Sequence, residues 1–215
     1  MKRYLPVIIA FSVTALLFQG CSKIDEPYYT IKAVYVDTTK RSVLLEDYTG
    51  HLCVNCAPAG KQANSLQETY KGQVYVIAVH AGSFARPSSD PKYYPYLIGD
   101  YTCQTGNDWN DFSGFQITQN PSGMVNRLAW KGKPSFVPSE WTGAIQHAVT
   151  LPKVAIMSGH SSYNSQNKLL TANVYTDFIQ AYPGPVTLTV CMLEDSIYGG
   201  QLNIIKPDSV PIIKN

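Results

Sequence analysis

The sequence predicts an α/β domain followed by a small, antiparallel β-rich region of sandwich-like character. A strand, helix, strand pattern over residues 43–79 and a hairpin that leads into a helix over residues 124–149 predict the domain. Apolar and polar residues that alternate after residue 151 predict the β-rich region, because each strand of a one-sided antiparallel sheet buries one face.

A leader precedes the predicted domain. Lys2 and Arg3 are followed by an apolar run over residues 5–18, which is the layout of a secretory signal peptide. The run holds about 14 residues, fewer than the roughly 20 that a helix needs to cross a bilayer. We therefore expect residues 1–20 to be a cleaved signal peptide rather than a membrane-spanning anchor.

The end of this leader resembles a bacterial lipobox, because Gly20 stands directly before Cys21 at the end of the apolar run. The resemblance implies that Cys21 is lipidated, and residues 21–40 are then a tether that leads into a first strand near residues 31–36. Ser22 fits sorting to the outer membrane by analogy. The alternative is cleavage to a soluble, secreted protein.

The charge of the chain does not indicate a polyanionic partner. The chain has 17 Lys and Arg residues and 15 Asp and Glu residues, and Lys2 and Arg3 lie in the leader. The predicted mature chain is therefore close to neutral, whereas nucleic-acid binding relies on an excess of positive charge at the contact. We expect no nucleic-acid partner.

The first predicted strand delivers the chain to a pair of cysteines. Residues 43–48 form a short apolar run that ends at Thr49 and Gly50. Apolar residues then recur at positions 59, 63, 66 and 70, which predicts an amphipathic helix over residues 53–70. The β-branched run over residues 74–79 predicts a strand buried on both faces.

The second half of the domain is predicted to begin with an insertion. Residues 81–113 are rich in proline and aromatic residues and have no long period, so we expect at most short helices there. Residues 124–130 and 135–137 predict a hairpin. Ser139 is expected to cap a helix over residues 140–149.

The remaining residues, 151–215, are predicted to form four strands separated by Asn, Gly and Pro. The predicted strands are residues 154–157, 168–176, 185–192 and 201–206. Because four strands are few for an independent sandwich, this region is expected either to dock on the first domain or to belong to a chain that stops short of its natural C-terminus.

The order of these elements is that of a thioredoxin fold, and the resemblance covers residues 41–150. Within that superfamily, three segments resemble the 28-kilodalton outer-membrane-protein family of Bacteroidetes lipoproteins. They are Glu46-Asp47-Tyr48-Thr49-Gly50, Cys53-Val54-Asn55-Cys56 and Asn120-Pro121-Ser122-Gly123-Met124-Val125-Asn126-Arg127. The layout of that family, a lipidated N-terminus, a thioredoxin-like domain and a β-rich tail, matches the layout predicted here.

The resemblance implies roles for residues outside the cysteine pair. Pro121 would be a cis proline that faces the pair, and the backbone of Asn120 would bind an extended substrate segment. Asp47 stands where thioredoxins place a buried carboxylate that helps to move the proton of the second cysteine. Its neighbour Glu46 is the competing candidate, because adjacent residues of a strand point to opposite faces and only one of the two faces the helix.

The chemistry of Cys53 and Cys56 also follows from their position. Unsatisfied N–H groups at the start of a helix favour a thiolate, and a second thiol one turn away resolves a mixed disulfide. We therefore expect Cys53 to be the more exposed nucleophile and Cys56 the resolving residue. A structural disulfide and a metal site are the alternatives, and Ala57 stands where a c-type haem site needs His.

The other cysteines and the nearby histidine carry weaker expectations. Four cysteines remain after Cys21, and their three possible pairings stay open. Cys191 is expected to be a free, buried thiol, and Cys103 lies in the insertion. His51 is expected to be a solvated loop residue, and the alternative is that it stabilises a thiolate of the pair.

Two functions remain open at this point. The first is a thiol–disulfide oxidoreductase, lipid-anchored in the outer membrane, that acts on envelope or surface proteins and peptides with no cofactor beyond its own dithiol. The second is a non-catalytic binding lipoprotein that uses the thioredoxin fold as a scaffold. An exposed Cys53 sulfur beside a cis Pro121 would favour the first, and burial of both sulfurs the second.

Overall fold

The computed structural model describes residues 39–111, 113–195, 197–203 and 212–214. The predicted signal peptide, Cys21 and the strand expected near residues 31–36 lie outside these residues. In the described ranges, no helix has the length and the apolar character that a membrane span requires. The described part is of mixed α/β class, with few helices.

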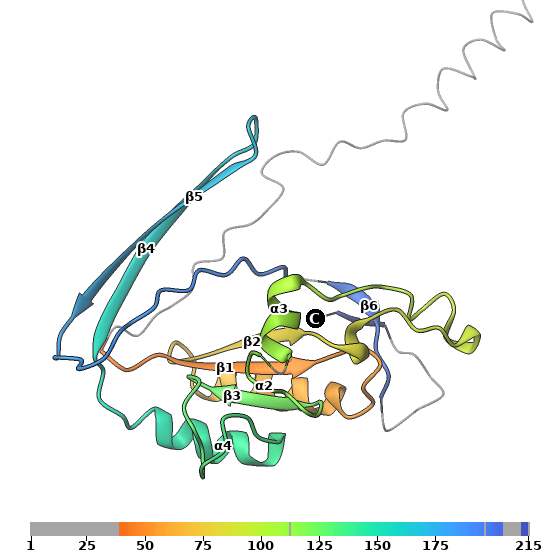
Figure 1. Ribbon diagram of the computed structural model, residues 1–215, viewed down its shortest axis with the longest axis horizontal. Helices are drawn as coiled ribbons and strands as arrows, with labels where there is room; N and C mark the ends of the chain where they lie inside the picture. The colour runs from red at the N-terminus through yellow and green to blue at the C-terminus, as the bar shows by residue number, and fades with distance from the viewer. Residues whose placement is uncertain (1–38, 112, 196, 204–211, 215) are drawn as a thin grey trace, which may run out of the picture. The chain divides into compact units, whose positions relative to one another are not determined.

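A three-stranded sheet with the order β2-β1-β3 lies at the centre of the domain (Figure 1). The middle strand β1 (Val43–Thr49) pairs in parallel with β2 (Val74–His80) and antiparallel with β3 (Ser122–Val125). An isolated bridge between Gly123 and Phe136 continues the sheet beyond β3. The predicted strand, helix, strand unit is therefore confirmed, and the predicted hairpin consists of β3 and this bridge.

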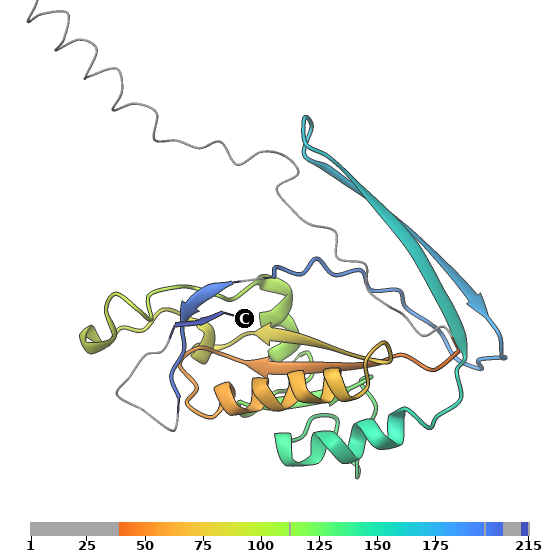
Figure 2. The same ribbon diagram turned by 180° about the vertical axis from the view of Figure 1, so that it is seen from behind.

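Two amphipathic helices, α2 (Cys56–Thr69) and α4 (Pro138–Ala148), pack on one face of this sheet (Figure 2). Their apolar sides, spaced as a helix requires, meet the residues that point to this face from β1 and β2. The main core is formed by Val43, Leu45, Ala59, Ala63, Leu66, Val74, Val125, Phe136, Trp141, Ala144, Ile145 and Ala148.

The insertion supplies the cover for the opposite face of the sheet. It holds the short helices η1 (Ser83–Ala85), η2 (Pro91–Tyr93) and α3 (Gln104–Asn110), as expected for this stretch. A second apolar cluster forms here, in which side chains of the insertion pack on the sheet. It consists of Tyr48, Val79, Ala81, Ile117 and Met124, with Ile77, Trp109 and Phe115 packed against it.

The two helices on the sheet begin at other residues than expected. Helix α2 begins at Cys56, so Cys53 lies in the turn before it. Helix α4 begins at Pro138 after Val137, so Ser139 is not the cap. The reason for the second difference is that a proline suits the first helical position, where its missing N–H is not needed. Strand β2 is an edge strand of the sheet and only partly buried.

The C-terminal region holds two small antiparallel sheets, and the first two of its four predicted strands are present. β4 (Ala155–Asn164) and β5 (Leu169–Phe178) form a hairpin, and β6 (Tyr198–Gly200) pairs with β7 (Ile212–Lys214). Residues 185–192 form no strand and their apolar side chains are exposed. Within the described ranges no second sheet packs on the hairpin, so the sandwich-like arrangement is not found there.

The last predicted strand was expected over residues 201–206, whereas β6 ends at Gly200. Residues 201–203 follow β6 without regular structure, and residues 204–206 lie outside the described ranges. The apolar and polar alternation that predicted these strands reports a local pattern only, whereas a strand also needs a partner edge for its backbone groups.

Candidate functional site

The cysteine pair forms a disulfide in the turn between β1 and α2. Cys53 is bonded to Cys56, with their Cα atoms 5.4 Å apart. The Cys53 N–H donates to the carbonyl oxygen of Gly50 (3.0 Å), and the Cys56 N–H donates to that of Cys53 (3.2 Å). We refer to residues 50–56 as the cysteine turn. Cys56 is the first residue of α2, and Cys53 lies in the turn before the helix.

Among the described residues, the two cysteines outside this turn, Cys103 and Cys191, are free and exposed. Cys103 caps α3, and its Sγ accepts a hydrogen bond from the Gly106 N–H (3.3 Å). The expectation that Cys191 is buried is wrong, because the segment around it forms no strand and its side chains are exposed. Of the pairings that the sequence left open, the structure contains the one within the cysteine turn.

Both cysteines of the turn are buried, with Cys53 only 4% and Cys56 3% exposed. The expectation that Cys53 is clearly the more exposed of the two is therefore wrong. The turn that carries them has a neighbour from outside the domain that was predicted to hold the site. A C-terminal segment packs on the cysteine turn and its hydrogen bonds hold it there.

We call this segment, residues 197–203, the strap. The Leu202 N–H donates to the carbonyl oxygen of His51 (2.9 Å). The buried side chain of Gln201 donates through Nε2 to the carbonyl oxygens of Cys53 (3.0 Å) and Gly50 (3.4 Å). Three backbone carbonyls of the cysteine turn thus accept hydrogen bonds from a segment about 150 residues away in the sequence, and those of Gly50 and Cys53 also accept one from within the turn.

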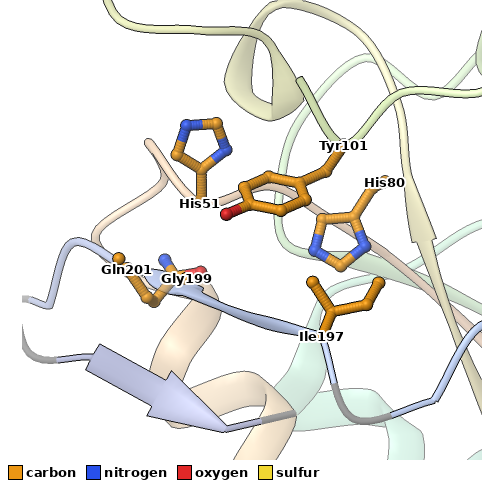
Figure 3. Close-up of a pocket in the computed structure, with 7 residues that line it drawn as sticks. His51, His80, Tyr101, Ile197, Gly199 and Gln201 are labelled. Carbon is orange, nitrogen blue, oxygen red and sulfur yellow. The ribbon is translucent and has the colours of Figure 1, made fainter. Parts of the chain in front are cut away.

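The strap closes a small cavity against three aromatic rings (Figure 3). Tyr101 lies between His51 and His80, at ring-centroid distances of 4.9 and 5.9 Å. A side chain at Gly199 would collide with the hydroxyl group of Tyr101 unless that ring shifts. The cavity measures about 10 Å³, which is room for one water molecule at most.

Both histidines beside the cavity are held neutral. Burial lowers the pKa of His51, and burial together with the neighbouring His51 lowers the pKa of His80 to about 4. The expectation that His51 is a solvated loop residue is wrong, because Tyr101 and the strap cover it. Near pH 7 this side of the cysteine turn therefore carries no positive charge from histidine.

Asp47 lies on the face of β1 that α2 covers. It shares the alternation of Val43 and Leu45, whose side chains belong to the core beneath α2. Burial raises the pKa of its carboxyl group to about 7. Among the described residues, its Oδ1 atom has no hydrogen-bond partner. Such a group is costly to bury and is poised to gain or lose a proton near neutral pH.

Glu46 points to the opposite face and has a full set of partners there. Arg127 donates to both of its carboxylate oxygens, at distances of 2.6 to 3.2 Å. The guanidinium carbon also lies 4.5 Å from the ring centres of both Trp109 and Phe115. Of the two candidate carboxylates, Asp47 is therefore the one on the face of β1 that α2 covers. Glu46 lies on the opposite face, where it pairs with Arg127.

The Asn120–Pro121 peptide bond is cis, the geometry that the resemblance implies. Pro121 directly precedes β3, where Ser122 lies opposite Tyr48 and Gly123 opposite Asp47. Asn120 and Pro121 are half-buried at this end of the sheet. The register brings them to the end of β1 from which the cysteine turn departs.

In the described ranges, no group of three His, Cys, Asp or Glu residues is arranged to hold a metal ion. The chain matches no model of a protein family, no curated protein and no solved structure. The geometry of the site is therefore the basis on which a function is inferred.

Two residues of this site have no direct signal in the sequence. Gln201 and Tyr101 lie far from the cysteine motif and belong to no recognised pattern. The pair Gly199-Gly200 beside Gln201 was the available signal, because consecutive glycines often mark a close approach to another part of the chain.

Proposed function

We propose that the chain is a thiol–disulfide oxidoreductase whose reacting groups are Cys53 and Cys56. The observation that carries the proposal is Asp47, a buried carboxyl with a pKa near 7 on the α2 side of β1. Fold stability alone gives no reason to bury a carboxyl group that lacks a partner for one of its oxygens. A proton acceptor behind a reacting cysteine gives such a reason.

The exchange reaction follows from this arrangement. A thiolate of the substrate attacks Sγ of Cys53, the Cys53–Cys56 bond breaks, and Cys56 leaves as a thiolate that takes a proton from the Asp47 carboxyl group. A second substrate thiolate then attacks the substrate sulfur of the mixed disulfide, and Cys53 leaves as a thiolate that water protonates. The substrate dithiol is thereby oxidised to a disulfide and the cysteine pair is reduced, and the reverse sequence reduces a substrate.

The domain around this site fits the thioredoxin fold, and this assignment is part of the proposal. The sheet order β2-β1-β3, continued by the bridge to Phe136, and the two helices α2 and α4 have the order and directions of that fold. With the lipobox at Cys21, we propose membership of the 28-kilodalton outer-membrane-protein family and a lipid-anchored place at the outer membrane. Envelope or surface proteins are then the substrates.

An exchange assay tests the proposal directly. Oxidative refolding of a reduced, disulfide-containing reporter protein should be faster with the wild type than with Cys53→Ser, because the variant cannot form the mixed disulfide. Cys103→Ser is the matched control, since Cys103 is a free, exposed cysteine of the same chain, and it should keep the wild-type rate. Equal rates for the wild type and Cys53→Ser would contradict the proposal.

The burial of both cysteines favours a second candidate function, a binding lipoprotein in which the disulfide only fixes the turn. Under this alternative, Cys53→Ser should fully restore the phenotype of a deletion strain. Under the redox proposal the same variant should fail to restore it, although the protein is present at the wild-type level in the membrane fraction.

A further inference from the structure

The carbonyl groups of the cysteine turn form a small surface that accepts hydrogen bonds from an extended segment. In this structure the strap occupies that surface, with the Leu202 N–H on the His51 carbonyl and the Gln201 amide on the carbonyls of Gly50 and Cys53. The strap reaches this point directly from β6, which ends at Gly200. A backbone that binds one extended segment through its carbonyls can bind another by the same hydrogen bonds.

We infer that the strap occupies, within the chain, the surface on which an extended polypeptide segment of the substrate docks, so that the disulfide reacts only after the strap is displaced. The inference rests on the proposed redox function and adds its regulation. It explains why a pair placed for exchange has both residues buried: the cover is a separate segment rather than the core of the domain.

The hydrogen bonds between the strap and the cysteine turn involve only Gln201 and Leu202 of the strap. The strap is also held by the pairing of β6 with β7, by the contact of Gly199 with Tyr101 and by the buried side chain of Leu202. A competing polypeptide replaces the same hydrogen bonds, so the exchange of one segment for the other loses little hydrogen-bond energy. Opening of such a segment requires far less than unfolding of the sheet.

The test measures how fast the disulfide of the folded, full chain is reduced by a water-soluble phosphine. Free thiols are first blocked with iodoacetamide, and the newly formed thiols are counted by mass after labelling with N-ethylmaleimide. The phosphine reaction is irreversible, so its rate reports access to the sulfurs and does not depend on the reduction potential. The inference and the proposed function can therefore fail separately.

Two strap variants should raise this rate. Gly199→Ala collides with Tyr101, and Gln201→Ala removes the amide that binds Gly50 and Cys53. We expect an increase of about tenfold for each, because one or two hydrogen bonds or a comparable packing contact are lost. The matched controls Gly184→Ala and Gln166→Ala change exposed residues outside the strap and should keep the wild-type rate.

Rates of the strap variants within twofold of the controls, in proteins with unchanged circular dichroism, would overturn the inference. A measurement on the wild type covers the case in which a variant does not fold. Below the urea concentration of global unfolding, the reduction rate should hardly depend on urea, because only the strap opens. A rate that rises with urea as steeply as global unfolding does would show that the sulfurs become accessible only in the unfolded chain.

Discussion

The two faces of β1 hold neighbouring carboxyl groups in opposite situations. Glu46 is buried with Arg127 bound to both of its oxygens, whereas Asp47 is buried with one oxygen lacking a partner among the described residues. Two buried carboxyl groups on the same strand thus differ: Glu46 has hydrogen-bond partners for both oxygens, whereas the burial of Asp47 is costly because one of its oxygens has none in the described part of the chain. The difference teaches that Glu46 belongs to the architecture, and that Asp47, on the side of α2, is the group to test for chemistry.

Removal of the charge of Asp47 should have the largest effect. The folded protein keeps a proton on Asp47 up to about pH 7, whereas the unfolded chain releases it near pH 4. The wild type therefore loses stability as the pH rises from 4 to 7. Asp47→Asn does not lose this stability. Its free energy of unfolding, relative to that of the wild type, should therefore grow by up to about 4 kcal/mol over this range.

Urea unfolding of the oxidised protein at pH 4 and pH 8 measures this difference. The matched control is Asp177→Asn on the exposed hairpin strand β5, which should show no such growth. If the exchange chemistry is right, Asp47→Asn should also slow reporter refolding near pH 7 although it is the more stable protein. A stabilised variant with the full exchange rate would remove Asp47 from the mechanism.

Loss of Arg127 should have the next largest effect and the opposite sign. Arg127→Met leaves Glu46 buried without its cation and should destabilise the protein by about 3 kcal/mol, less than for a fully buried pair because the Arg127 side chain is 35% exposed. Thermal or urea unfolding at pH 7 checks this value. Lys133→Met, at an exposed position, should stay within about 0.5 kcal/mol of the wild type. An equally small change for Arg127→Met would mean that Glu46 is not dependent on its partner.

His80 should give the smallest effect, on the acid side. The folded protein resists protonation of His80 until about pH 4, whereas the unfolded chain takes up the proton near pH 6.5. Between pH 6.5 and pH 4, the free energy of unfolding of the wild type should therefore fall by roughly 2 kcal/mol more than that of His80→Asn. This value is smaller than the pKa difference alone would give, because His80 is only partly buried. His160→Asn on exposed β4 is the control. Parallel pH profiles of the wild type and His80→Asn would contradict the burial of a neutral His80.

Much of the sheet and its helices could be predicted from the sequence, because each element has a strong local signal. The helical spacing of Ala59, Ala63 and Leu66 and the β-branched run of β2 are local patterns, and both elements are present. The resemblance also named Asp47 and Glu46 as competing candidates. The choice between them needed the structure, because alternation says that they face opposite ways but not which face receives α2.

The cover of the cysteine pair could not be predicted, because it depends on contacts between distant segments. Nothing near Cys53 indicates that Gln201 will bind its carbonyl group, and the alternation near residues 201–206 indicated a strand instead. The prediction of a strand over residues 185–192 in the β-rich tail was wrong for a related reason. Val186, Leu188 and Val190 alternate as a strand would, yet they remain exposed and unpaired in the described structure, since a strand forms only where another edge receives it.

The central claim is that the Cys53–Cys56 disulfide is redox-active, and its reduction potential tests this claim most directly. The full chain is equilibrated in glutathione or dithiothreitol buffers of known potential, with Cys103 and Cys191 blocked, until approach from the oxidised and the reduced side agrees. The account predicts a reversible potential between about −270 and −120 mV, the range of dithiols that exchange with proteins. A potential below about −300 mV, as in inert structural disulfides, would contradict it.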